Sequence, residues 1–170
     1  FLMIGDLSQS PFYGSIGQLY VPFGRYSSSM ISDTLTNYIG KTKARTIILS
    51  YAPQNKVAPY VHVFAFKGDA KYGNSNLVSQ NGIDAGFRYG KGDYSSNLDA
   101  SYIANLADSN GMQNNARTSG FQGFDKSNVE NITHRVGGAD IHASLSYGKW
   151  IFLGEYLSAL QQLNRNALSF

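Results

Sequence analysis

The strongest constraint on the fold is a strict alternation of apolar and polar residues within residues 136–160. An alternation with a period of two is typical of a strand that has one apolar and one polar face. Gly148 and Lys149 follow the alternating run from Ala139 to Tyr147 and precede the returning run from Trp150 to Leu160, and Gly supplies the positive φ that a tight hairpin turn needs. We therefore predict one β-hairpin in which Tyr147 pairs with Trp150. The same register gives three more pairs, on which the assignment of faces depends: Leu145 with Phe152, Ile141 with Tyr156, and His142 with Glu155.

Similar patterns recur along the rest of the chain, and they predict a single class of secondary structure. Further strands are predicted at residues 1–5, 12–21, 45–52, 59–67, 82–90 and 97–107, and no convincing helical pattern is present. The prediction is therefore all-β, an antiparallel up-and-down meander of about eight strands. A four-residue turn at 91–94 would pair Arg88 with Asn97.

The connections between the predicted strands alternate in length. They are short at 7–11, 53–57, 91–94 and 148–149, and long at 22–43, 68–80 and 108–135. Short turns at one end and long loops at the other are typical of transmembrane β-barrels. Aromatic residues flank the short turns, as they do at membrane interfaces: Phe12, Tyr13, Tyr51, Tyr60, Tyr89, Tyr94, Tyr147 and Trp150. The layout predicts part of a larger transmembrane β-barrel.

The chemistry of the two strand faces favours the same interpretation. The apolar faces of the two best hairpins carry no charge, whereas the opposite faces carry Arg88 and five further ionisable residues, namely Asp84, Asp99, Asp140, His142 and Glu155. Such charges are costly in a packed core unless they are paired, but not in a water-filled lumen. We predict that the apolar faces contact lipid and that the ionisable residues line the lumen. Ile151, Leu153 and Leu157 fall on the predicted lumen face and conflict with this, unless a loop folded into the pore meets them.

Composition argues against several classes of function. The chain has 170 residues, no Cys, 3 His and a net charge of +3. Without Cys there is neither a disulfide framework nor a thiolate metal site, and we expect no metal or cofactor. The slight charge and the lack of a nucleic-acid-binding motif argue against nucleic acid as a partner. No Gly-x-Ser-x-Gly motif is present and no Ser is placed beside His142, so we expect no enzyme and no catalytic residue. Both ends lie inside runs that read as structure, which predicts a single partial barrel segment truncated at both ends.

Four segments resemble the LbtU family of outer-membrane siderophore porins. They are residues 15–24 (SIGQLYVPFG) with 26–32 (YSSSMIS), residues 102–111 (YIANLADSNG), the pair His134 and Arg135, and residues 154–159 (GEYLSA). The resemblance implies a plug-less barrel of the bacterial outer membrane that takes up a ferric polycarboxylate siderophore. It also implies further strands outside this chain, which would complete the same barrel with it.

An anionic ferric chelate would be bound by cationic side chains in a place that excludes bulk water. The candidates are Arg88 in the predicted lumen, Lys41, Lys43 and Arg45 at the long-loop mouth, and Arg117, Lys126, His134 and Arg135 in or beside the 108–135 loop. Two other functions fit the same residues. One is a general diffusion porin, and the other is a soluble β-sandwich binding module with its apolar faces turned inward.

Overall fold

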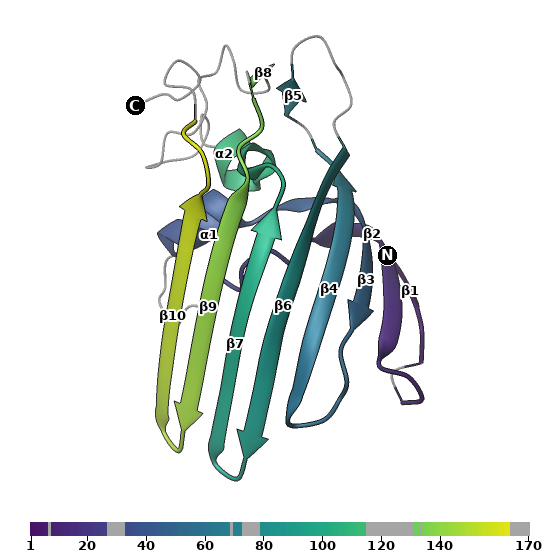
Figure 1. Ribbon diagram of the computed structural model, residues 1–170, viewed down its shortest axis with the longest axis vertical. Coiled ribbons are helices and arrows are strands. Elements are labelled where there is room, and N and C mark those ends of the chain that lie inside the picture. The colour runs from purple at the N-terminus through teal and green to yellow at the C-terminus, as the bar shows by residue number, and fades with distance from the viewer. Residues whose placement is uncertain are drawn as a thin grey trace.

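A computed structural model of the chain describes residues 1–6, 8–26, 33–68, 70–72, 79–114, 131–132 and 134–163. Ten strands, two short α-helices and one 3-10 helix lie in these residues (Figure 1). In chain order they are β1 (Leu2–Ile4), β2 (Phe12–Tyr20), α1 (Leu35–Gly40), β3 (Lys43–Tyr51), β4 (Ala58–Lys67), β5 (Lys71–Tyr72), β6 (Ser79–Lys91), β7 (Tyr94–Ile103), the 3-10 helix (Leu106–Asp108), α2 (Asn110–Asn114), β8 (Asn131–Ile132), β9 (Gly138–Tyr147) and β10 (Trp150–Ala159).

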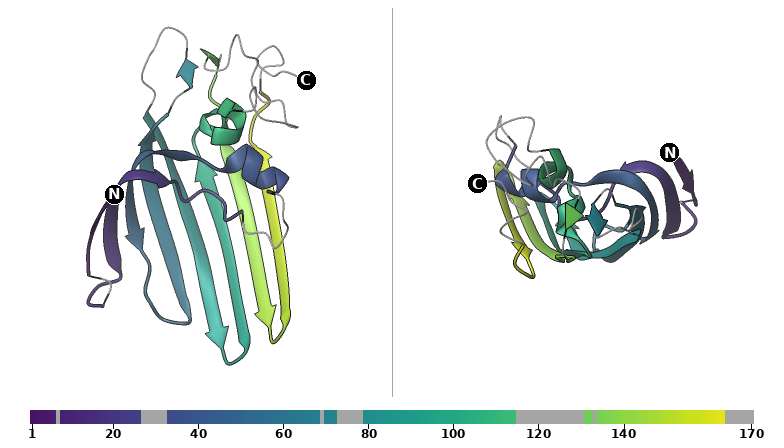
Figure 2. Two further views of the ribbon diagram at one scale, coloured as in Figure 1. Left: turned by 180° about the vertical axis from the view of Figure 1, so that it is seen from behind. Right: turned by 90° about the horizontal axis from the view of Figure 1, so that it is seen from above.

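Eight of the strands form one antiparallel sheet in the order β1-β2-β3-β4-β6-β7-β9-β10. The predicted all-β meander is therefore confirmed. The sheet is open, with β1 and β10 at its two edges, and it is curved when seen from above (Figure 2). The tight connections all lie at the lower end in Figure 1, which we call the short-turn end. The backbone N–H of Gly148 donates to the carbonyl of Asp93, so the turns of two neighbouring hairpins lie side by side there.

The predicted pairing of β9 with β10 is confirmed residue by residue. Tyr147 pairs with Trp150 and His142 with Glu155, and the two other predicted pairs are present as well. Arg88 also pairs with Asn97, although the turn between β6 and β7 is shorter than predicted because Lys91 and Tyr94 already pair. Gly92 and Gly148 have φ angles of +59° and +55°, as these tight turns require.

The two faces of the sheet have opposite chemistry. One face, here called the outer face, carries large apolar side chains that are 40 to 67% exposed: Ile47, Leu49, Val63, Ile83, Phe87, Leu98, Tyr102, Ile141, Phe152 and Tyr156. The other, concave face, here called the inner face, carries Asp84, Asp99, Asp140 and His142, all at least 95% buried. Within the described residues no second sheet covers the outer face, because the other sheet is only the short pair β5 and β8. A sandwich core on that face is therefore not observed.

The prediction that the chain has no helix is wrong. The hydroxyl of Thr34 accepts from the backbone N–H of Asn37 and caps α1, which lies with α2 on the concave side of the sheet (Figure 2). The strand predicted at 97–107 also ends early, at Ile103, and the chain turns into the 3-10 helix. These short helices are stabilised by packing against the sheet rather than by helical propensity, because isolated helices of this length are unstable.

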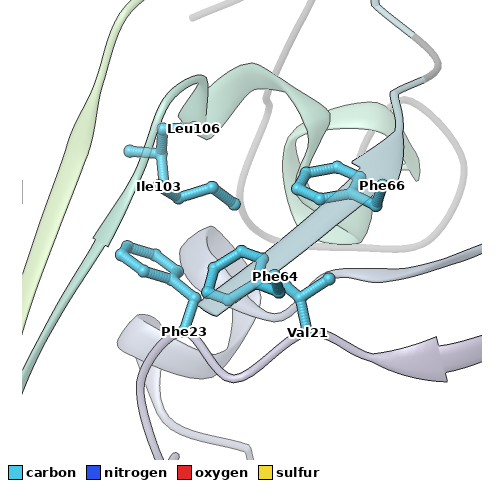
Figure 3. Close-up of a cluster of buried hydrophobic side chains, with 6 residues drawn as sticks. All are labelled: Val21, Phe23, Phe64, Phe66, Ile103 and Leu106. Atoms are coloured by element: carbon cyan, nitrogen blue, oxygen red, sulfur yellow. The ribbon is translucent and has the colours of Figure 1, made fainter. Parts of the chain in front are cut away.

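An apolar cluster joins the segment after β2 to the inner face near the end of the sheet opposite the short turns, which we call the long-loop end. It contains Val21, Phe23, Phe64, Phe66, Ile103 and Leu106 (Figure 3). Leu157 of β10 packs against this cluster. Of the three apolar residues that the sequence places on the polar face, Leu157 is therefore covered by a segment folded onto that face. Gly40 lets α1 approach this region, because a Cβ there would overlap Leu157 and Tyr26. Ile151 and Leu153 stay exposed, at 69% and 42%.

No helix in the described part of the chain combines the length and the apolar character needed to cross a membrane.

At the long-loop end, β5 and β8 pair in parallel through Lys71 with Asn131 and Tyr72 with Ile132. This pair joins the connection between β4 and β6 to the connection between β7 and β9.

Phe23 is the residue through which the segment after β2 enters the apolar cluster, with only 1% of its surface exposed. We predict that Phe23→Ala lowers the free energy of unfolding by about 3–5 kcal/mol, because it removes a fully buried ring and leaves a cavity. Leu35→Ala is the control, since Leu35 on α1 is 61% exposed, and its effect should stay below about 0.5 kcal/mol. Urea titration followed by far-UV circular dichroism measures both. Equal effects of the two substitutions would contradict the packing described.

Candidate functional site

The ionisable residues of the inner face come from five adjacent strands. Tyr60 and His62 lie on β4, Asp84 on β6, Asp99 on β7, Asp140 and His142 on β9, and Glu155 on β10. Register places Asp99 opposite His142 and His142 opposite Glu155, so these three form a row across the sheet. Their side chains share one face because alternate residues of a strand point to the same side. The structure thus brings together Asp84, Asp99, Asp140, His142 and Glu155 on the face predicted for them.

Residues 21–26 and 33–42, which follow β2, cover this row, and we call them the inner segment. Gly24 has a φ of +69°, a left-handed conformation that favours glycine. The backbone N–H groups of Arg25 and Tyr26 both donate to Oε1 of Glu155, each at 2.9 Å. The Thr36 hydroxyl donates to the other oxygen of the same carboxylate, at 2.8 Å. One side chain of β10 therefore binds both parts of the inner segment.

A second carboxylate, Asp99, organises the polar groups beneath the inner segment. Arg25 Nε lies 3.3 Å from Asp99 Oδ2, and Arg25 Nη2 donates to the Tyr60 hydroxyl at 2.7 Å. The same Asp99 oxygen lies 3.0 Å from that hydroxyl and 3.2 Å from Nδ1 of His142. His142 therefore bonds to Asp99, its register partner on β7. The Asp99 side chain is 1% exposed while that of Arg25 is 40% exposed, so the positive group is the one that reaches the surface.

A further polar row crosses β3, β4 and β6. The Ser50 hydroxyl lies 2.8 Å from Nδ1 of His62, and Nε2 of His62 lies 4.0 Å from Oδ2 of Asp84. The residue types match those of a hydrolase triad. However, 4.0 Å is too long for a hydrogen bond, and Ser50 is only 5% exposed. In this conformation the row therefore lacks both an oriented base and an accessible nucleophile.

Several buried polar atoms of the inner face have no hydrogen-bond partner among the described residues. They include both carboxylate oxygens of Asp140, one oxygen of Asp99, Nε2 of His142 and the hydroxyl of Tyr26. Burial raises the pKa of Tyr26 well above its ordinary value, so the hydroxyl remains protonated at neutral pH. Within the same residues, no group of three His, Asp or Glu side chains is arranged to hold a metal ion.

The predicted cationic residues that the structure describes do not converge on one place. Arg88 lies on the inner face, and its guanidinium carbon is 5.6 Å from the centre of the Tyr60 ring. Arg45 was predicted at the mouth of the long loops, but alternation places it with Ile47 and Leu49 on the outer face, so it does not join the inner-face residues.

The other candidates lie elsewhere. His134 and Arg135 are exposed just before β9, where Nε2 of His134 lies 2.9 Å from the carbonyl of Gln162. Lys41 and Lys43 lie over the ring of Tyr20 instead, at 5.0 and 5.6 Å. Arg117 and Lys126 lie outside the described residues.

Two residues of the site were missed by the sequence interpretation. Arg25 is not among the predicted site residues, although the preceding Gly24 in a Pro-Phe-Gly sequence signals a change of chain direction. Tyr60 was assigned to an interfacial ring of aromatic residues, and that assignment is wrong, because Tyr60 is 2% exposed and lies on the inner face. Alternation with Val61 and Val63 on the opposite face of β4 could have placed it correctly.

Comparison with known proteins finds relatives along the whole chain. It is 40% identical over 172 residues to a UPF0422 protein of Coxiella burnetii, and this alignment covers 100% of the chain and 35% of that relative. It is 33% identical over 174 residues to UPF0422 proteins of Legionella pneumophila strains Lens and Philadelphia 1, covering 32% of each. The chain thus spans about a third of the length of these relatives. No family model and no solved structure matches the chain.

Glu155 should control how firmly the inner segment is held. We predict that Glu155→Ala speeds amide hydrogen exchange at Arg25 and Tyr26 by at least about tenfold, because hydrogen bonds to a charged acceptor contribute about 1.5–3 kcal/mol. Glu155→Gln keeps an acceptor oxygen without the charge, so its increase should be smaller. Exchange that is the same in all three proteins would show that Glu155 does not hold the segment.

Proposed function

We propose that this chain forms part of the wall of a β-barrel in a bacterial outer membrane. The observation that supports this most strongly is the outer face, which keeps large apolar side chains exposed along the whole meander. Soluble monomers rarely expose contiguous apolar patches of more than a few hundred Å². A lipid bilayer would cover this face, and β-strands cross bilayers only within closed barrels. Further strands of the same protein would close the open sheet at β1 and β10, in keeping with relatives about three times as long.

The intact barrel, on this proposal, takes up a ferric polycarboxylate siderophore through its polar interior. The resemblance of residues 15–24, 102–111 and 154–159 to siderophore porins supports this substrate class. Arg25 and Arg88 supply guanidinium groups on the face that would border the passage. The inner segment would narrow the passage and make it selective, as loops folded inside a barrel do.

The lipid-facing role of the outer face can be tested with two adjacent residues. Ala143 is exposed on the outer face in the middle of β9, and Ser144 points to the inner face. We predict that Ala143→Arg lowers the free energy of unfolding of the intact protein in lipid vesicles by about 2–4 kcal/mol, the cost of Arg near the bilayer midplane.

Ser144→Arg is the matched control and should change that free energy by less than about 1 kcal/mol, because its charge would enter water. Urea titration of the protein in vesicles measures both variants. A harmless Ala143→Arg, as expected at an ordinary solvent-exposed position, would contradict a membrane role.

The uptake proposal can be tested in the loop that carries Arg117 and Lys126. We predict that replacing residues 115–130 by a Gly-Ser linker weakens binding of ferric citrate, used as a probe, by at least about tenfold. The replacement spares the buried residues Leu106, Ala107, Asp108, Ser109 and Met112, so the sheet should still assemble.

Replacing residues 73–78, which carry no charge, by a linker of equal length is the control and should leave binding unchanged. Ferric citrate binding that survives the 115–130 replacement would remove this loop from the site. Conductance in planar bilayers that ignores ferric chelates altogether would instead identify a general diffusion porin.

A further inference from the structure

Two guanidinium groups from distant parts of the chain lie over one aromatic ring on the inner face. The guanidinium carbon of Arg25 is 5.2 Å from the centre of the Tyr60 ring, and that of Arg88 is 5.6 Å from the same centre. Arg25 comes from the inner segment and Arg88 from β6, so the pair exists only when the segment is in place. Cation–π attraction favours each group over the ring, and the Tyr60 hydroxyl accepts a hydrogen bond from Arg25.

The two arginines are unequal in their existing partners. Arg25 is paired with Asp99. Arg88 donates to the backbone carbonyl of Pro53 at 3.1 Å and forms no ion pair with any residue that the structure describes. Each guanidinium therefore keeps most of its N–H donors unused within this part of the chain. Two positive charges at the same ring, one of them without an ion-pair partner among the described residues, favour the binding of an anion.

The carboxylates nearby do not cancel this preference at the surface. Asp84, Asp99 and Asp140 are 4%, 2% and 1% exposed, and the oxygens of Glu155 accept from the inner segment. Arg88 is exposed, and the Arg25 side chain is 40% exposed. A solute that approaches the inner face near Tyr60 thus meets guanidinium groups first, with the acidic groups buried beneath.

We propose that Arg25, Arg88 and Tyr60 form a binding site for oxyanions. Planar guanidinium forks match the oxygens of carboxylates and phosphates, which is the shared chemistry of the ligand class. The Tyr60 ring holds both forks in place, and Asp99 orients that of Arg25. The site rests on the proposed function only in that the inner face borders a passage for solutes.

The test uses the intact protein that contains this sequence, purified in detergent, and isothermal titration with sodium citrate and sodium phosphate. At least one probe should bind, and Arg88→Gln should weaken that binding by at least about tenfold. Arg88→Lys, which keeps the charge but not the fork, should retain part of the affinity. Arg88 is the residue to change because it is exposed, so the variant should fold.

Lys91→Gln is the matched control. Lys91 is the last residue of the same strand and lies on the outer face, so loss of its charge should leave binding unchanged. Tighter binding of citrate would assign the site to carboxylates, and tighter binding of phosphate to phosphates. Absence of binding by both probes, or equal binding by Arg88→Gln and the unmodified protein, would overturn the site. Far-UV circular dichroism of each variant confirms that the sheet is intact.

The outcomes separate this site from the proposed function. If the protein conducts ions in bilayers but binds neither probe, the barrel proposal stands and the oxyanion site is refuted. If it binds a probe through Arg88 but fails to enter vesicles, the oxyanion site stands and the membrane role is refuted.

Discussion

The whole structure is built on one sheet whose two faces differ in chemistry, one apolar and the other polar. Strand geometry alternates side chains between faces, so each strand presents apolar groups to one side and polar groups to the other. Part of the polar side is covered by the chain itself, through the inner segment. The apolar side is left exposed in the described residues. Because exposed apolar area is unfavourable in water, this exposure is the main support for the proposed contact with lipid.

Two kinds of interaction hold the inner segment, and they act at different positions along the strands. Near the long-loop end, Phe23 packs into an apolar cluster with Phe64 and Ile103. Below it, Glu155 and Asp99 accept hydrogen bonds from the backbone and guanidinium of the segment. The apolar contact supplies binding energy without direction, whereas charged acceptors fix the position of the backbone. Together they place Arg25 over Tyr60, so the chemistry near that ring depends on both.

Much of the sheet could be predicted because its signal is local. The alternation in β9 and β10 and the Gly of their turn specify the register without knowledge of any other strand. The inner segment could not be found this way, because its place depends on contacts between residues far apart in sequence, such as Arg25 with Asp99. Strand β7 was extended too far because periodicity does not reveal where the 3-10 helix begins. Arg45 lies near the start of β3 on the same face as Ile47, and closeness to a loop in the sequence does not reveal that face.

The central claim is that the outer face contacts lipid while the inner face contacts water, and spin labels along β9 test it most directly. This sequence has no Cys, so once any Cys outside it has been replaced, single Cys substitutions from 138 to 147 can be labelled without background. In lipid vesicles, collision with oxygen, which concentrates in lipid, should be high at positions such as Ile141 and Ala143. Collision with a water-soluble nickel complex should be high at positions such as Ser144, giving a period of two. Uniform access of the nickel complex to both faces would contradict the account.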